Sequence, residues 1–258
     1  MLLLAYPFIT TPLLDNAVQM GERINYLEPY IALLNSNFMI LVIPAVFLML
    51  RSDFPRMDGN TLLVVMRAGK KNWFLGQIVY LLLSIFTYIA VLFAGRVLQV
   101  MGRGEVSNQW SIVVQEFATR FPEQAQGQGA TSIPTQIYYH MSPRYAVVMG
   151  VFLLTLYLLL LALILLCVSI AGNKKVGILI DFAIMGIGMG LCTTTSPYRF
   201  VMPMANSLLG VHFSKYYKEM VFSVTGSLVY FAILIFVIFV VSYWLNRKRC
   251  FFMNQESD

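Results

Sequence analysis

Several stretches of this chain are apolar for long enough to cross a lipid bilayer, and this feature constrains the fold before any other. A helix rises about 1.5 Å per residue and the hydrocarbon core is about 30 Å thick, so about 20 apolar residues make one crossing. Lipid cannot satisfy backbone N–H and C=O groups, and each stretch must therefore be a helix. The five stretches lie at about 30–50, 74–95, 145–171, 176–192 and 224–245.

The first 14 residues form a sixth, shorter apolar segment. It contains Pro7 and Pro12 and is too short for a comfortable crossing. A re-entrant or interfacial piece is one alternative, and a short or truncated first span at 1–14 is the interpretation we favour. The prediction is then an all-α fold, a polytopic transmembrane helix bundle of six spans over residues 1–258.

Composition supports one integral membrane domain. Apolar residues are 59% of the chain and charged residues 12%, against about 25% charged in soluble domains. No segment between the spans looks able to build a core of its own. The net charge of +6 does not indicate nucleic acid, because the basic residues lie beside the spans. Cys167, Cys192 and Cys250 show no spacing typical of a disulfide framework or a metal site.

Charge also orients the spans. Ten of the 18 lysine and arginine residues fall in three segments, 51–73, 172–176 and 246–258. The positive-inside rule places the denser basic loops in the cytoplasm. We therefore expect a cytoplasmic C-terminus and two long outer loops, 97–144 and 193–223.

The connection between the spans at 30–50 and 74–95 carries more pattern than a linker needs. Asp53 can cap a helix, and Pro55 is tolerated in its first turn. Helical spacing then places four side chains on one side of the segment: Phe54, Met57, Thr61 and Val65. This pattern predicts a short cytoplasmic helix.

Basic residues gather where this segment ends. Arg67, Lys70 and Lys71 lie at the C-terminal end of the predicted helix, where the dipole favours cations. Trp73 is expected at the headgroup level, which suits an amphipathic indole. An interfacial linker with a positive-inside cluster would look similar, but the length and charge favour a surface that docks a soluble partner.

The same region resembles a known family. The residues concerned are Asn35-Ser36, Asp53-Phe54-Pro55-Arg56, Arg67, Lys71-Asn72-Trp73 and Gly76-Gln77. With them the chain resembles the membrane (permease) subunit of an ATP-binding-cassette (ABC) exporter of the second type, in particular the divergent permeases of Gram-positive bacteria. The resemblance extends to the six-helix plan across most of the chain.

The resemblance implies a role for the 53–69 segment as a coupling helix in a cleft of a separate ATPase subunit. Asp58-Gly59 stands where the family has an acidic-Gly pair. The residues that would contact or position this partner are Asp53, Phe54, Arg56, Met57, Asp58, Thr61, Val65, Arg67 and Lys71. A second permease subunit, identical or related, and a bacterial plasma membrane are also implied.

Catalytic signatures are missing from the sequence. It has no Gly-x4-Gly-Lys-Ser/Thr loop for nucleotide phosphates and no His-Glu-x2-His. His140 and His212 are isolated, and as lone residues they fit packing or surface roles better than metal ligation. We expect no enzyme activity in this chain and no cofactor or metal, with ATP hydrolysis in a partner subunit.

Two intramembrane features are candidate sites. Asp181 lies well inside the span at 176–192, where a carboxylate is costly and must face the bundle, pair with a cation or take up a proton. Pairing with Lys174 or Lys175 is the interpretation we favour over a coupling or substrate-cavity role. In the same span, Gly186 and Gly190 lie one turn apart, which allows close helix packing within the subunit or at a subunit interface.

The outer loops contain more than turns. Trp110, Val113, Phe117 and Phe121 have helical spacing and predict an amphipathic helix on the outer surface. Segment 197–223, with prolines and aromatic residues, predicts short re-entrant helices before the last span.

Taken together, these patterns predict a permease subunit that exports a hydrophobic or amphipathic substrate, such as a peptide, lipid or drug, by alternating access. Two alternatives stay open. One is a secondary transporter or channel that works alone, with Asp181 as an ion-linked group. The other is a non-transporting membrane scaffold or sensor, in which residues 97–144 recognise a ligand.

Overall fold

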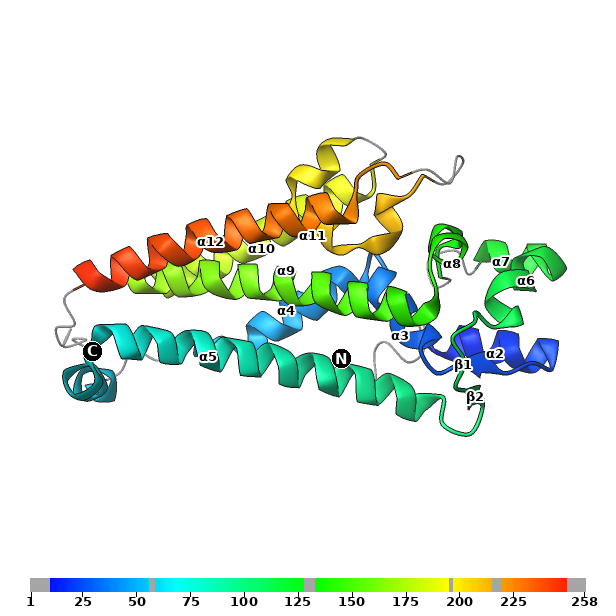
Figure 1. Cartoon of the computed structure of the whole chain (residues 1–258), viewed down its shortest axis with the longest axis horizontal. Coiled ribbons are helices and arrows are strands. Elements are labelled where there is room, and N and C mark those ends of the chain that lie inside the picture. Colours follow the sequence, from blue (N-terminus) through cyan, green and yellow to red (C-terminus); the bar gives the residue numbers. More distant parts are fainter. Residues whose placement is uncertain (1–9, 56–58, 128–132, 195–196, 215–219, 250–258) are drawn as a thin grey trace.

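A computed structural model describes residues 10–55, 59–127, 133–194, 197–214 and 220–249. Long helices lie side by side along the long axis (Figure 1). They are α4 (Met39–Leu50), α5 (Gly59–Gln99), α9 (Pro143–Ala171), α10 (Lys174–Cys192) and α12 (Val224–Lys248). Shorter elements gather at one end: α2 (Thr11–Met20), α3 (Glu28–Asn35), α6 (Ile112–Arg120), α7 (Pro122–Gly127) and α8 (Thr135–His140).

Four of these helices, α5, α9, α10 and α12, are long and apolar enough to cross a membrane. The number is five if α3 and α4 together count as one bent span. The predicted apolar stretches at 74–95, 145–171, 176–192 and 224–245 are thus confirmed as helices. The described chain is an all-α bundle of the kind expected of a multi-pass membrane protein.

The stretch at 30–50 is not one straight helix, contrary to the prediction. The axes of α3 and α4 differ by 84° across the break at residues 36–38. Ser36 is extended, with φ −76° and ψ 121°, and its hydroxyl accepts a hydrogen bond from Met39 N at 3.4 Å. Asn35, Ser36 and Asn37 offer the backbone alternative partners, which explains why an apolar run breaks at this point.

Helix α9 is the centre of the bundle. More than half (56%) of its most apolar window is buried, against 11% for α12. Its side chains contact α3, α5, α10, α11 (Pro203–Ser207) and α12. The hairpin between α9 and α10 turns at Gly172, which has φ 111°, a conformation that glycine adopts without steric cost.

The end opposite the basic segments, which we call the far end, has its own small core. Leu14, Ala17, Ile24, Val100 and Val113 form a second buried cluster there. Beneath it, β1 (Ile24–Asn25) pairs in parallel with β2 (Gly104–Glu105). No single segment between the spans forms this cluster, because it combines residues from segments that are distant in sequence.

The predicted first span at 1–14 is not seen as a span in the part that is described. Residues 1–9 lie outside the described residues, and Thr11 begins α2, which ends at Gly21 in a left-handed conformation. This helix packs on α6 at the far end (Figure 1). The predicted amphipathic helix is confirmed as α6, with Val113 and Phe117 buried.

Segment 193–223 folds back between the long helices. It contains η2 (Pro197–Val201), α11 and η3 (Leu209–His212). Met204, Ala205 and His212 are fully buried. Gly210 N donates to Asn35 Oδ1 at 3.1 Å, so this segment also stabilises the break between α3 and α4.

Candidate functional site

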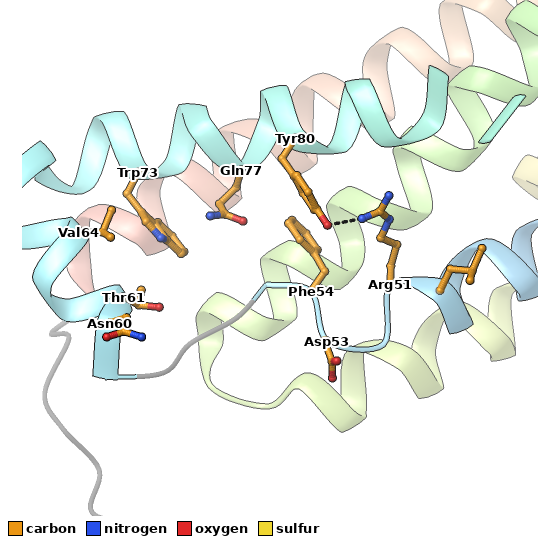
Figure 2. Close-up of a pocket in the computed structure, with 10 residues that line it drawn as sticks. Arg51, Asp53, Phe54, Asn60, Thr61, Val64, Trp73, Gln77 and Tyr80 are labelled. Atoms are coloured by element: carbon orange, nitrogen blue, oxygen red, sulfur yellow. Dashed lines mark hydrogen bonds between the residues drawn. The ribbon is translucent and has the colours of Figure 1, made fainter. Parts of the chain in front are cut away.

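The candidate site lies at the end where residues 51–71 and 246–249 meet, which we call the basic end (left in Figure 1). Its first part is the loop after α4. The guanidinium of Arg51 stacks over the Tyr80 ring at 4.8 Å and donates to the Tyr80 hydroxyl. The Phe54 ring stacks on the Tyr80 ring, with the two ring centroids 5.6 Å apart and the ring planes 19° from parallel. The loop is thereby anchored to α5 (Figure 2).

The second part is a short helix at the start of α5. Gly69 has φ 80° and ψ 154°, so residues 59–68 form a helical segment of their own ahead of the long one. Only glycine adopts this backbone conformation readily. Figure 1 shows the short helix nearly end-on at the basic end, whereas the rest of α5 runs along the bundle. We call residues 59–68 the crossing helix.

The crossing helix has an inner and an outer side. Thr61 and Val65 are buried at 7% and 8% exposure, and with buried Phe54 they hold the helix against the bundle. Leu63 and Met66 are exposed at 54% and 72%. Exposed apolar residues at a helix surface are typical of a contact with another protein or with lipid headgroups.

A cavity of about 650 Å³ separates the loop and the crossing helix from the long part of α5. Figure 2 shows side chains from the three segments around it. Its lining combines aromatic rings with polar groups: Leu50, Arg51, Asp53, Phe54, Asn60, Thr61, Val64, Trp73, Gln77 and Tyr80. The cavity therefore borders the crossing helix at Asn60, Thr61 and Val64.

The third part connects the helix ends to one another. Lys70 Nζ donates to the carbonyls of Arg247 and Arg249 at 3.2 and 2.6 Å, and Asn246 Nδ2 donates to Lys70 O at 3.0 Å. Arg249 Nη1 in turn donates to the carbonyls of Ser169 and Ile170 at 2.8 and 2.6 Å. The ends of α5, α9 and α12 are therefore joined just after Gly69.

Arg249 is placed where a cation stabilises a helix. The last carbonyls of α9 carry the negative end of its dipole, and Arg249 satisfies two of them. Burial lowers the pKa of the Arg249 guanidinium, yet an arginine stays charged at neutral pH. The predicted basic cluster thus contributes to folding as well as to charge.

The residues predicted to contact a partner fall into three groups. Asp53, Arg67 and Lys71 are exposed and accessible to a second protein. The buried Phe54, Thr61 and Val65 position the segment and do not face outward. Arg56, Met57 and Asp58 lie outside the described residues.

Sequence reasoning missed the anchoring residues of this site. Arg51 was counted only as a topogenic charge, and Tyr80 was one aromatic residue within a span. Trp73 was expected at the headgroups, but it is buried at 5% exposure and lines the cavity. The helical spacing of Leu63 and Met66, opposite Thr61 and Val65, was the available signal for the outer side.

Asp181 lies apart from the basic end, in the bundle interior. It is fully buried, and neither carboxyl oxygen has a hydrogen-bond partner within the part of the chain that the structure describes. The expected pairing with Lys174 or Lys175 is therefore wrong for the described residues: Lys175 is exposed and no ion pair joins these lysines to Asp181. The Tyr157 hydroxyl on α9 is also buried without a partner.

The predicted packing role of Gly186 and Gly190 within one subunit is also wrong. An added Cβ at either position would meet no atom within 4 Å among the described residues. Gly188 is the glycine that is packed, because a Cβ there would lie 2.9 Å from Met204 Cβ. Gly186 and Gly190 each lie two residues from Gly188, a helical rotation of about 200°, which turns the pair away from the core.

Comparison with known proteins identifies no relative. No family model matches the chain, and neither a curated protein nor a solved structure matches it. Among the described residues, no group of three or more His, Cys, Asp or Glu could hold a metal ion.

Proposed function

We propose that this chain is the membrane subunit of an ATP-driven exporter, in which a separate ATPase docks on the basic end. The crossing helix supports this proposal above all. It lies across the bundle, it carries exposed Leu63, Met66 and Arg67, and it is separated from the long part of α5 by Gly69. A helix with this placement can be displaced by a soluble protein and can transmit the displacement to the spans.

The hydrogen bonds that follow Gly69 in the chain connect this displacement to the other helices. Lys70 contacts the end of α12, and Arg249 contacts the end of α9. A displacement at residue 70 would therefore act on three long helices together. The cavity under the crossing helix would allow this helix to move. Its movement would shift the bundle between two arrangements, as alternating access requires.

Under this proposal the basic end is cytoplasmic, in accord with the positive-inside rule, and the membrane is a bacterial plasma membrane. A second permease subunit would cover helix faces left open in one chain. The outward side of α10, with Gly186, Ile187 and Gly190 exposed, is a candidate for this contact. The transported substrate would be hydrophobic or amphipathic.

Charge reversal tests the docking surface. In cells that express the chain, a photoreactive amino acid at Leu63 should cross-link to a protein that carries a nucleotide-binding Gly-x4-Gly-Lys-Ser/Thr loop. Changing Arg67→Glu and Lys71→Glu together should weaken this cross-link, and the transport-coupled ATP hydrolysis of the reconstituted complex, roughly tenfold. Arg103→Glu, a single charge reversal at an exposed far-end position, is the control, and each single reversal at Arg67 or Lys71 matches it in charge.

Two results would contradict the proposal. One is full ATPase coupling in the double charge reversal with normal insertion. The other is reaction of Asn60→Cys, in a background without other cysteines, with an impermeant maleimide added outside intact cells. That second result would place the crossing helix outside, where no ATPase could reach it.

A second candidate function has one observation in its favour. Asp181 is fully buried with both oxygens unpartnered in the described chain, and an intramembrane carboxylate without a partner is typical of ion-coupled transport. In proteoliposomes that contain only this chain, a pH gradient should then drive uptake or efflux that Asp181→Asn abolishes. Absence of gradient-driven flux in the purified chain would exclude this alternative.

A further inference from the structure

A second cavity, at the far end, is built quite differently from the cavity at the basic end. It is a cleft of about 760 Å³ between the last turns of α5 and the first turns of α9. Its lining is almost entirely apolar: Asn25, Tyr26, Leu27, Phe93, Val97, Met101, Val106, Ser107, Arg144, Val147 and Val148. Its volume lies within the range of about 300–1,000 Å³ typical of sites for small molecules.

The walls of the cleft come from three separate parts of the chain. Phe93 and Val97 lie one turn apart on α5, Met101 follows in the turn after this helix, and Val147 and Val148 lie on α9. Tyr26 closes the end, and Gly104 makes this possible, because a Cβ at residue 104 would lie 3.0 Å from the Tyr26 ring. Met101, Val106 and Val148 are 73%, 83% and 64% exposed, so the rim is open.

Arg144 is the only charged residue among those that line the cleft. It is exposed and forms no ion pair or hydrogen bond within the described residues. It lies in the first turn of α9, where the helix dipole disfavours a cation. The side-chain amide of Asn25, a polar group that also lines the cleft, already donates to the carbonyls of Ser107 and Gln109. Arg144 therefore has no structural role in the described chain, and its charge is left for an external anion.

We propose that this cleft binds an anionic membrane lipid, with one acyl chain between α5 and α9 and the acidic headgroup on Arg144. Both helices are long and apolar enough to cross a membrane, and the cleft lies near their far-end termini, where headgroups meet the hydrocarbon. A neutral lipid would fill the apolar part but leave Arg144 unpaired. An extended protein segment would bury backbone N–H and C=O groups against walls that offer few partners.

Native mass spectrometry of the full-length protein tests the proposal. The protein is purified in nanodiscs that contain equal amounts of dioleoyl-phosphatidylglycerol and dioleoyl-phosphatidylcholine, and the lipids retained after release are counted. Wild type should retain phosphatidylglycerol over phosphatidylcholine. Arg144→Gln should lower this preference roughly tenfold, and Arg144→Lys should keep most of it. Val97→Trp, which fills the cleft, should remove retained lipid of both kinds.

Matched controls separate a binding defect from misfolding. Arg103→Gln removes an exposed far-end charge that does not line the cleft, and Leu98→Trp places the same indole on an exposed neighbouring position. Both should retain lipid as wild type does. Equal retention by Arg144→Gln and wild type would overturn the proposal. So would loss of self-association instead of lipid in Val97→Trp, because that result would make the cleft an interface between copies of the chain.

Discussion

The two ends of this bundle differ in the hydrogen bonds that their polar side chains form. At the far end, polar side chains bond to one another and to loop backbone: the Glu28 carboxylate accepts from Asn25 N, Ser111 N and the Ser111 hydroxyl at 2.7–3.1 Å. At the basic end, Lys70 and Arg249 donate to backbone carbonyls at the ends of α12 and α9. The far end is therefore a hydrogen-bonded cap that also borders the apolar cleft, whereas the basic end is a joint at Gly69.

A second network makes the same point about the far end. Asn206 Nδ2 donates to the carbonyls of Phe200 and Met202, and the Ser227 hydroxyl donates to Asn206 Oδ1 at 2.7 Å. His212 Nε2 lies 2.8 Å from Ser227 Oγ. All these groups bind the folded-back segment 197–212 to the start of α12. Polar networks that are well bonded add rigidity, whereas a glycine joint permits motion.

The largest effect should follow from removing the carboxylate of the cap. Glu28→Ala leaves the amides of Asn25 and Ser111 buried without an acceptor, and the free energy of unfolding should fall by about 3 kcal/mol. Thermal unfolding in detergent measures this loss, with the exposed Glu123→Ala as control. An equal loss in the control would show that the far end is not held by Glu28.

Restricting the backbone at Gly69 should affect the joint at the basic end. Gly69→Ala forces a side chain into φ 80° and ψ 154°, and should lower stability by about 2 kcal/mol or straighten the helix at residue 69. Gly76→Ala is the matched control, since neither added Cβ would meet an atom within 4 Å, and it should be neutral or stabilising by up to about 1 kcal/mol. Identical effects at both positions would argue against a joint at Gly69.

A smaller effect is expected from the contact between helix ends. Arg249→Gln removes donors from the Ser169 and Ile170 carbonyls, which water at this half-exposed position can partly replace, so the loss of stability should be about 1 kcal/mol. Hydrogen exchange at the last turn of α9 should rise in this variant. Exposed Arg247→Gln should leave that exchange unchanged.

The smallest expected effect concerns pH at the cap. Burial lowers the pKa of the His212 imidazole below its ordinary 6.5, although the Leu208 carbonyl opposes this shift. The unfolded chain then takes up a proton first as pH falls, so stability is complete above about pH 6.5 and declines below it. His212→Gln should flatten this decline in thermal unfolding, and the exposed His140→Gln should not.

Sequence patterns predicted what depends on local periodicity. The long apolar runs that became α9, α10 and α12 needed only the thickness of a bilayer and the rise of a helix. The spacing of Val113 and Phe117 likewise predicted α6. The buried side of the crossing helix, with Thr61 and Val65, followed from the same rule. The expected helix start at Asp53 was wrong, because Asp53 and Phe54 lie in a loop and the helix begins at Gly59.

The remaining features depend on contacts between distant residues. Arg51 bonds to Tyr80, and Arg249 bonds to a carbonyl at the end of α9. Because the partners are far apart in sequence, no periodic pattern predicts these contacts. The far-end core combines residues from α2, β1 and α6. Asp181 shows the same limit, since lysines close in sequence suggested a partner, but its carboxylate has none within the described residues.

The central position of α9 has a consequence for how the molecule is made. Helices α3 and α5 both pack on α9, which follows them in the chain. A ribosome therefore releases the whole of residues 28–142 before their shared neighbour emerges. Until α9 is made, α3 and α5 can pack on each other but lack the helix that each contacts most in the finished bundle.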